Sequence, residues 1–327
     1  MRKLGAEPVD ISMSRTGLNP LRDFGDLVGL YSTLKDLKLD TVLSFAIKPV
    51  IYGTSAARLA RVPKRFALIA GLGYAFGDDR QSTLKRRTIR GVARCLYTLA
   101  LLQTQKVFMQ NPDDVEDFAA MKIVTRDKME LVNGTGVDLA DWPFLPSVTA
   151  PITFLLAARL LAEKGINDYV AAARTIKAKA PNTRFVLLGG LDSNPNGIER
   201  SQVEQWVTEG LIEWPGHVPV RPWVAEASVY VLPSYYREGI PRSIQEALAS
   251  GRPVITTDAP GCRETVVHGR NGFLVRPRNA DQLVQAMQQF LDNPRLIVDM
   301  GQQSRLLAEE RFDVRAINAR MLDIMGL

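Results

Sequence analysis

The segment Val229–Val275 reads VYVLPSYYREGIPRSIQEALASGRPVITTDAPGCRETVVHGRNGFLV. It opens with a short apolar run, Val229–Leu232, which is typical of a buried strand in a parallel sheet. Pro241 follows a few residues later and suits the first turn of a helix, because its missing N–H would have no helical partner there. Ligands of open α/β sheets bind beyond the carboxyl ends of the strands, so the turn between this strand and this helix is predicted to face a crevice.

That turn carries a glycine and is flanked by two carboxylates. Gly239 lets the backbone approach a ligand closely, and the unpaired N–H groups of the following helical turn favour an anion. Glu238 and Glu246 are separated by seven residues, which allows them to contact opposite ends of one extended ligand. An anion site between two carboxylates that can hold vicinal hydroxyls indicates a nucleotide-sugar. The alternative interpretation is that Glu238 is a helix N-terminal acid and Glu246 a surface charge.

Short apolar runs alternate with helical patterns along the rest of the chain. The expected strands are Val9–Met13, Thr41–Ser44, Arg65–Ala70, Lys106–Met109, Ile152–Ala157, Arg184–Leu188, Val229–Leu232 and Pro253–Thr256. The expected helices are Leu21–Leu37, Pro49–Ala60, Gln81–Thr104, Gly165–Ala180, Pro241–Ala249, Ala280–Leu291 and a final helix after Phe312. This alternation predicts the α/β class, with two Rossmann-like halves whose parallel sheets are covered on both faces.

The boundary between the halves is expected near Trp142–Pro151, because the three prolines of this stretch stop a helix and stiffen a linker. We therefore expect an N-terminal domain at residues 1–145, a C-terminal domain at 151–310 and a C-terminal helix at 311–327. The chain reaches its first expected strand almost at once, and no glycine-rich turn leads from that strand into a helix. The first half is thus expected to lack its opening strand-helix unit.

Composition excludes several classes of protein. Of the 327 residues, 46% are hydrophobic and 23% are charged, which is ordinary for a globular protein and excludes disordered and collagen-like chains. Two cysteines and two histidines are too few for a disulfide framework or a four-ligand zinc site, and they argue against a His-based triad. The apolar runs fall short of the roughly 18 residues of a membrane-spanning helix, so the cytoplasm is the expected compartment.

Much of the net charge of +6 comes from residues 80–112, which hold seven basic residues and no acidic one. Five of the seven recur at near-helical spacing: Lys85, Arg86, Arg87, Arg90 and Arg94. One interpretation is a solvated helix with an apolar inner face. The other is a basic face for anionic lipid or for a diphosphate-linked acceptor. Nucleic acid is the weakest alternative, because no aromatic residues interleave with the basic ones.

The second half of the chain resembles the donor domain of family 4 glycosyltransferases, which have the two-Rossmann GT-B fold. The resemblance rests on an ordered set of motifs: Ala157–Gly165, Gly216, Glu238 with Glu246, Gly251–Ile255, Asp258–Gly261, Glu264 and Asn271–Val275. It implies that Arg159 and Lys164 clamp the donor diphosphate, as two cations at a strand end would. It also implies that Glu238 orients the sugar hydroxyls and Glu246 holds the ribose. The remaining donor-binding positions that it implies are Gly216, Gly239, Ile240, Ser243 and Ile244.

The first half is similar to one branch of that family, the bacterial enzymes that build O-antigen, capsule or lipid-linked oligosaccharides. The matching stretches include Ser14–Pro20, Lys48–Gly53, Gly71–Phe76, Gln110–Asp114 and Asn133–Asp138. On this basis the acceptor is expected near Gly71 and Gly73. A dinucleotide fingerprint is not satisfied there, because Phe76 stands where a small residue is required. The family pattern begins about 50 residues further upstream, so the N-terminus is expected to be truncated, which would leave an unpaired sheet edge.

The resemblance implies a retaining glycosyltransferase that moves a sugar from a nucleoside-diphosphate donor, a UDP-hexose or UDP-N-acetylhexosamine, to a glycan or polyprenyl-diphosphate-linked acceptor. No Asp-x-Asp motif occurs, and no metal or other cofactor is expected. The basic helix would place the protein peripherally on the cytoplasmic face of the inner membrane, and no nucleic-acid partner is expected. The alternative function is a non-catalytic nucleotide-sugar or glycan-binding remnant. A nicotinamide dehydrogenase is a third class that already lacks its fingerprint.

Overall fold

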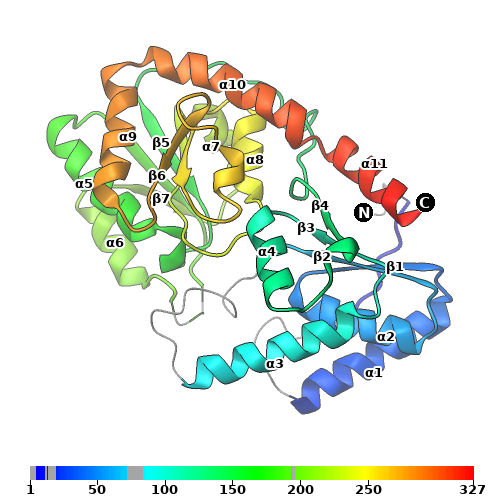
Figure 1. The fold of residues 1–327 in the computed structure, drawn as a ribbon. Coiled ribbons are helices and arrows are strands. Elements are labelled where there is room, and N and C mark those ends of the chain that lie inside the picture. The colour runs from blue at the N-terminus through cyan, green and yellow to red at the C-terminus, as the bar shows by residue number, and fades with distance from the viewer. Residues whose placement is uncertain (1–4, 12, 14–19, 72–83, 193, 195) are drawn as a thin grey trace. The chain divides into compact units, whose positions relative to one another are not determined.

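The computed structural model describes residues 5–11, 13, 20–71, 84–192, 194 and 196–327. The chain divides into two compact units. The first contains residues up to Ala70, Asp78–Leu131 and Asp323–Leu327, and the second contains Gly71–Gly77 and Val132–Leu322. Each unit has its own parallel sheet, and both are labelled in Figure 1. The expectation of an α/β chain with two Rossmann-like halves is confirmed.

The second unit is built on a six-stranded parallel sheet with the strand order β10-β9-β8-β5-β6-β7. Its strands are β5 (Thr153–Ala157), β6 (Arg184–Leu188), β7 (Glu213–Gly216), β8 (Val229–Leu232), β9 (Val254–Thr257) and β10 (Gly272–Val275). All residues of β5, β8 and β9 are buried, so both faces of the sheet are covered at its centre. Such coverage explains why these strands read as continuous apolar runs rather than as alternating ones.

The helices of the second unit are α5 (Ile166–Lys179), α6 (Arg200–Thr208), α7 (Val220–Glu226), α8 (Arg242–Ala249), α9 (Ala280–Asp292), α10 (Arg295–Arg311) and α11 (Val314–Met325), with 3₁₀ turns η6 (Ala162–Lys164) and η7 (Arg263–Thr265). In α5 the buried residues include Ile166, Tyr169, Ala173 and Ile176, which follow the helical period. Their stripe joins the core formed by the central strands.

The first unit holds a four-stranded parallel sheet in the order β1-β2-β3-β4. Its strands are β1 (Thr41–Phe45), β2 (Lys64–Ile69), β3 (Lys106–Met109) and β4 (Met129–Leu131). Its helices are α1 (Pro20–Leu37), a π-helical turn η2 (Pro49–Gly53) that continues into α2 (Thr54–Leu59), α3 (Leu84–Leu101), α4 (Pro112–Ala120) and the 3₁₀ turn η5 (Arg126–Lys128). In the described sheet β1 is an edge strand, and its Leu43 and Phe45 are 40% and 48% exposed.

The predicted elements agree with the structure to within a few residues, apart from one strand. Residues 9–11 and 13 form no strand, so the expectation for Val9–Met13 is wrong for the part of it that the structure describes. Alternating apolar residues favour a strand only where one face is buried, and Val9 and Ile11 are about half exposed. Three strands were not predicted: β4, β7 and β10. In the described sheets all three are edge strands. Their sequences are MEL, EWPG and GFLV, and none of them has the four-residue apolar run that marks β8.

The segment around the predicted boundary is fixed to the second unit. Leu145 N donates to Ser250 O at 3.2 Å. Two arginines donate to carbonyls of the same stretch: Arg252 Nη1 to Pro146 O at 2.8 Å and Arg305 Nη1 to Trp142 O at 2.9 Å. Arg252 is fully buried, and burial lowers its pKa to about 10. Residues 142–146 therefore form part of the second unit's packing, while the division of the chain at 145 and 151 stays a prediction.

Candidate active site

Two loops meet at the place where the second sheet reverses its strand order. From β5 the chain proceeds to β6 and β7 on one side, and from β8 it proceeds to β9 and β10 on the other. Because β5 and β8 are parallel neighbours, their carboxyl ends lie together. A crevice outside the carboxyl ends at such a switch point is the usual ligand site of open α/β sheets.

The two loops are packed closely. Gly165 has φ +75°, and a Cβ placed on it would lie 2.1 Å from Pro233 O, so only glycine fits at this position. The carbonyl of Glu163 accepts hydrogen bonds from Tyr235 N at 2.9 Å and from Tyr236 N at 3.2 Å. The loop after β5 and the loop after β8 are thus joined through backbone groups, which fixes the side chains that they carry.

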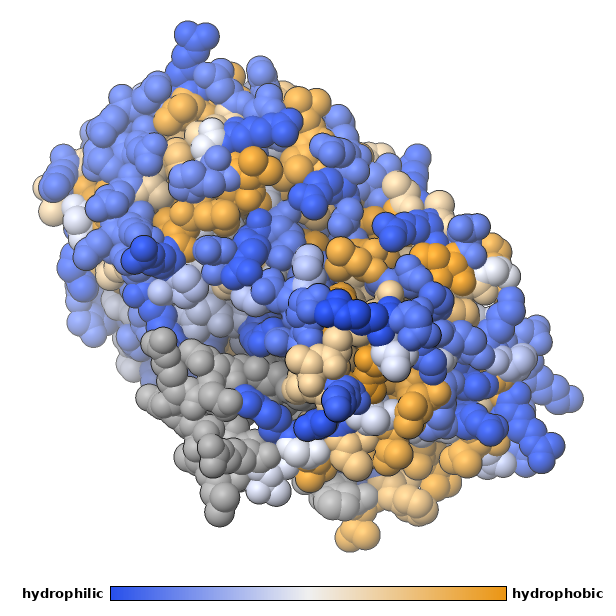
Figure 2. All heavy atoms as spheres, viewed as in Figure 1, coloured by the Kyte–Doolittle hydropathy of each residue, from blue (hydrophilic) through white to orange (hydrophobic). Residues whose placement is uncertain are grey.

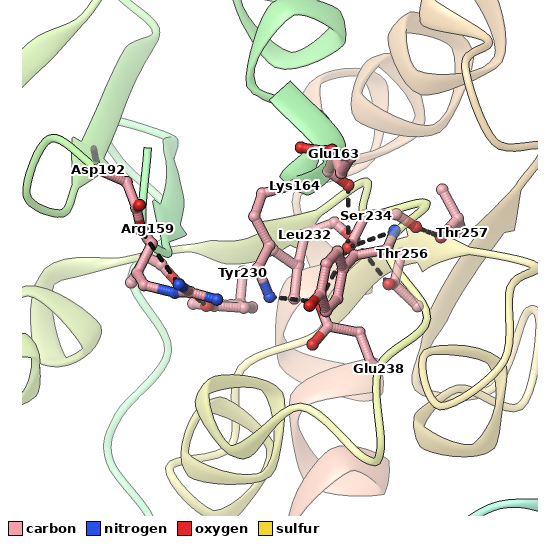
Figure 3. Close-up of polar contacts among 12 residues, drawn as sticks. Arg159, Glu163, Lys164, Asp192, Tyr230, Leu232, Ser234, Glu238, Thr256 and Thr257 are labelled. Carbon is pink, nitrogen blue, oxygen red and sulfur yellow. Dashed lines mark hydrogen bonds and ion pairs between the residues drawn. The ribbon is translucent and has the colours of Figure 1, made fainter. Parts of the chain in front are cut away.

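The centre of the site is an ion pair between Lys164 and Glu238. Lys164 Nζ donates to Glu238 Oε1, and both side chains are only 12% exposed (Figure 3). The ammonium also lies 5.3 Å from the centroid of the Tyr236 ring. A second donor, Ser234 Oγ, lies 3.0 Å from the same carboxylate oxygen. The two charges predicted to serve a diphosphate and a sugar are therefore brought together on neighbouring loops.

Arg159 lies in the loop after β5 but is not part of that pair. Its Nη1 donates to Asp192 Oδ2 at 3.0 Å, and its side chain is 58% exposed (Figure 3). The structure thus gives each of the two predicted diphosphate cations its own carboxylate partner. An exposed guanidinium with one ion pair can turn toward an incoming anion at little cost, since surface ion pairs contribute at most about 1 kcal/mol.

The turn that leads into α8 is set by backbone packing. A Cβ on Gly261 would lie only 1.6 Å from Gly239 O, so the two glycine backbones are in direct contact. Gln245, which is fully buried, donates through Nε2 to Ile240 O at 3.1 Å. Ile244 is fully buried as well, so it can meet a ligand only through its backbone, whereas Ser243 is half-buried. Gly239 and Ile240 are positioned by these contacts at the start of α8.

Glu246 lies in the second turn of α8 and is not a surface charge. Its side chain is 15% exposed, and its Oε1 accepts from Arg242 Nε at 3.0 Å. Burial raises the pKa of this carboxyl above its ordinary value, and the Arg242 charge acts in the opposite direction. A half-satisfied, mostly buried carboxylate at the edge of a ligand crevice is well suited to accept hydrogen bonds from hydroxyls.

A separate pocket of about 360 Å³ lies beyond the carboxyl ends of β6 and β7, lined by Gly190, Leu191, Arg200, Trp214, Pro215, Gly216 and His217. Trp214 Nε1 donates to Gly189 O at 3.0 Å, which fixes the indole. The Arg200 guanidinium lies 5.7 Å from the indole centroid. Gly216 has φ +84°, and no atom lies within 4 Å of the position of its missing Cβ, so its backbone is open to the pocket.

Of the site residues predicted for the first half, the structure describes only some. Gly71 is the second residue after β2, has φ +89° and groups with the second unit, while Gly73 lies outside the described residues. The basic residues lie on α3, as their spacing predicts. Arg94 is exposed and Arg90 half-buried. The side chains of Lys85, Arg86 and Arg87 lie outside the description.

The described residues contain neither a cluster of metal ligands nor a helix that could span a membrane. In the ranges given above, no three His, Cys, Asp or Glu side chains gather in a cluster that could hold a metal ion. Among the helices of those ranges, none has both the length and the apolarity needed to cross a bilayer.

The second unit is thus an open α/β sheet with a Lys–Glu ion pair at its switch point, which is the usual place for a ligand in this class of protein. Comparison with known proteins gives the family. The model of the family described as Glycosyl transferases group 1 matches residues 151–293. This chain therefore contains a group 1 glycosyltransferase domain, and the predicted recognition is confirmed. The matched residues include Arg159, Lys164, Gly216, Glu238 and Glu246.

Two curated relatives align along most of the chain. One is the N,N'-diacetylbacillosaminyl-diphospho-undecaprenol alpha-1,3-N-acetylgalactosaminyltransferase of Campylobacter jejuni, 28% identical over 92% of this chain and 81% of its own. Another is the UDP-Gal:alpha-D-GlcNAc-diphosphoundecaprenol alpha-1,3-galactosyltransferase of Escherichia coli, 27% identical over 84% of this chain and 72% of its own. Against the putative colanic acid glycosyltransferase WcaL of Escherichia coli K12, 29% identical, the chain spans about half of the relative's length, 50%.

Solved structures share the fold. Anabaena Alr3699/HepE in complex with UDP-glucose superposes with a TM-score of 0.76 at 19% identity, covering 94% of this chain and 84% of that one. Sucrose-phosphate synthase from Thermosynechococcus elongatus gives a TM-score of 0.76 at 22% identity, covering 94% and 79%. At such identities the likeness concerns the fold alone. It agrees with the two-domain GT-B architecture that the sequence predicts.

Proposed function

We propose that this glycosyltransferase is a retaining enzyme that uses a UDP-hexose or UDP-N-acetylhexosamine donor in the assembly of cell-surface polysaccharide. The observation that carries the proposal is the Lys164–Glu238 pair at the switch point between β5 and β8. One partner has the charge for a diphosphate and the other has acceptor oxygens for sugar hydroxyls. Both are held on loops whose backbones are joined.

The donor would extend from this pair in two directions. Its diphosphate would meet Lys164, Arg159 and the N–H groups at the start of α8, where a helix N-terminus favours anions. Its ribose would meet Glu246. Its base would enter the pocket beyond β6 and β7, where Gly216 offers open backbone and Trp214 offers a fixed aromatic surface. Base recognition through backbone groups requires no particular side chain, which suits a glycine at this position.

The proposed reaction needs charge stabilisation more than a protein base. The acceptor hydroxyl oxygen bonds to the anomeric carbon while the bond from that carbon to the donor phosphate oxygen breaks. The proton of the hydroxyl passes to the departing phosphate oxygen, on the same face. Lys164 and Arg159 stabilise the negative charge of the leaving diphosphate, and Glu238 orients the sugar. Retention of configuration is proposed on the family resemblance alone.

The acceptor is proposed to be lipid-linked, because the names of the Campylobacter jejuni and Escherichia coli relatives specify a diphospho-undecaprenol-linked acceptor for those proteins. The surface of α3 supports this. One face of the helix carries exposed residues, namely Val92, Cys95 and Leu99 of α3 and Leu102 directly after it. Leu99 is 57% exposed and Leu102 is 63% exposed. Figure 2 shows apolar and charged side chains next to one another over the region where Figure 1 draws α1 and α3. An exposed apolar face on a helix that also carries an exposed arginine, Arg94, on a neighbouring side fits an anionic membrane surface.

Release of UDP from UDP-sugars tests the proposal. The purified chain is incubated with UDP-glucose, UDP-N-acetylglucosamine and UDP-N-acetylgalactosamine, with and without membrane-extracted lipid acceptor, and compared with Lys164→Ala. Acceptor-dependent UDP release that Lys164→Ala abolishes is the expected result. UDP binding without release would support the non-catalytic nucleotide-sugar binder instead. Absence of both from a folded protein would contradict the donor-site assignment.

A further inference from the structure

Ser234 is the residue of the site that the sequence did not single out. It follows β8 after one proline and is fully buried. Its Oγ lies 3.0 Å from Glu238 Oε1 and 3.2 Å from Glu163 O, and it accepts from Tyr236 N at 3.2 Å. Its own carbonyl accepts from Thr257 Oγ1 on β9 (Figure 3). The backbone of Ser234 is therefore held from β9, and its hydroxyl contacts both the loop after β5 and the Glu238 carboxylate of its own loop.

The single hydroxyl proton has two candidate acceptors. Glu163 O already accepts from Tyr235 N and Tyr236 N. Glu238 Oε1 is closer, and a carboxylate is a stronger acceptor than a carbonyl because it is charged. The proton therefore goes to Glu238, and Tyr236 N supplies the donor that the hydroxyl oxygen accepts.

We propose that Ser234 is a positioning residue that orients Glu238 toward the donor sugar. The inference rests on the proposed function, because it assigns a role within the same donor site. Lys164 and Ser234 hold the same carboxylate oxygen. When the ammonium shifts toward a diphosphate, the serine keeps Glu238 in place. The orientation of the carboxylate then no longer depends on the ion pair that donor binding loosens.

The test separates sugar recognition from nucleotide recognition. Calorimetric titration gives the Kd for UDP and the Kd for one UDP-sugar. The UDP-sugar chosen is the one from which the wild-type chain releases most UDP. If the chain releases none, the UDP-sugar that it binds most tightly is used. The ratio of the two Kd values isolates the contribution of the sugar. The variants are Ser234→Ala, Ser234→Thr, which keeps the hydroxyl, Glu238→Gln and the double variant of Ser234→Ala with Glu238→Gln. Ser228→Ala is the matched control, because Ser228 is a fully buried serine that precedes the same strand and accepts from Thr153 N at 2.9 Å.

The expected result is a specific loss of sugar recognition. Ser234→Ala should weaken UDP-sugar binding relative to UDP by at least about fivefold, as loss of a hydrogen bond to a charged group would. Ser234→Thr should retain most of the wild-type ratio. Adding Ser234→Ala to Glu238→Gln should change the ratio little further, because the serine acts through the carboxylate. Ser228→Ala should lower the melting temperature and leave the ratio unchanged.

Several outcomes would overturn the inference. A wild-type ratio in Ser234→Ala would remove the positioning role while leaving the donor site intact. An equal weakening of UDP and UDP-sugar, matched by Ser228→Ala, would show a structural role only. Full additivity of the two substitutions would show that the serine does not act through Glu238. Failure of the wild-type chain to bind UDP would refute the proposed function itself, and with it this role.

Discussion

The two parallel sheets of the molecule differ in how completely they are covered and in where their strand order turns. In the second unit β5, β8 and β9 are buried throughout, and the order reverses between β5 and β8. In the first unit the described strands follow one another from β1 to β4 without a reversal, and β1 exposes Leu43 and Phe45. A ligand crevice is therefore expected in the second sheet, where the loops diverge.

The second unit also has the more specific sequence motifs, and the packing of its site explains why. Residues of the second unit's site are fixed by close contacts, such as Gly165 against Pro233 O and Gly261 against Gly239 O. Such contacts permit a single residue type, so they leave a readable pattern. The first unit's helix α3 needs only an apolar and a basic face, which many sequences satisfy.

The largest expected effect is on the central ion pair. Lys164→Ala removes the mostly buried cation that we propose meets the diphosphate, so UDP affinity should fall by at least about 30-fold. Lys177→Ala is the control, since that lysine is on α5 and donates only to a surface carbonyl, Gly210 O. Calorimetry checks both variants. A Lys164→Ala chain that binds UDP as tightly as the control would remove the donor site from the second unit.

Next in size is the backbone contact that shapes the turn before α8. Gly261→Ala would bring a Cβ to 1.6 Å from Gly239 O, which forces the turn to move. We expect a loss of about 3 kcal/mol in the free energy of unfolding, together with weaker UDP binding. Gly269→Ala is the comparison: its φ is +78°, but no atom lies within 4 Å of the added Cβ, so about 1 kcal/mol is expected. Urea unfolding that gives both variants the same cost would refute the close-contact argument.

Replacing Glu246 by glutamine should weaken UDP binding without lowering the stability of the fold at neutral pH. Glu246→Gln is expected to weaken UDP binding about tenfold through the ribose. Burial raises the pKa of this carboxyl, so the folded state holds more protons than the unfolded state just above the ordinary carboxyl pKa. The free energy of unfolding therefore falls as pH rises through that window, and glutamine removes this loss.

Melting temperatures measured across pH test this sign. Glu246→Gln should melt at or above the wild-type temperature at neutral pH, and the difference should shrink in acid. Glu309→Gln, which breaks a comparable i,i+4 pair with Arg305 on α10, should leave UDP binding unchanged. A Glu246→Gln chain that is less stable than wild type at neutral pH would mean that the carboxylate serves the fold.

The smallest expected effect concerns the exposed surface of α3, for which we propose contact with a membrane. Arg94→Glu and Leu99→Glu each place an acid on the exposed face of α3 and should weaken binding to phosphatidylglycerol vesicles several-fold, most strongly at low salt. Arg295→Glu, on the exposed surface of α10 in the second unit, serves as the charge-matched control. Co-sedimentation that shows equal loss for the α3 variants and the control would reduce the effect to net charge.

Much of the fold could be predicted because apolar runs and helical periods mark buried elements, as the agreement of β6 and β8 with their expected ranges shows. The edge strands β7 and β10 could not, since β7 (EWPG) contains polar and turn-forming residues and β10 (GFLV) has an apolar run of only three residues, whereas all four residues of β8 are apolar. The pairing of Lys164 with Glu238 and the role of Ser234 also escaped prediction. They depend on the adjacency of β5 and β8, whereas Glu238 follows Lys164 by 74 positions in the sequence.

The central claim is that the second unit holds a formed donor site for a uridine diphosphate. Titration of the purified chain with UDP, and with GDP and NAD as controls, tests it most directly. We expect the chain to bind one UDP saturably and in preference to GDP and NAD. Lys164→Ala should strongly reduce this binding. A folded chain that shows no heat of binding with UDP, or that binds all three nucleotides equally, would contradict it.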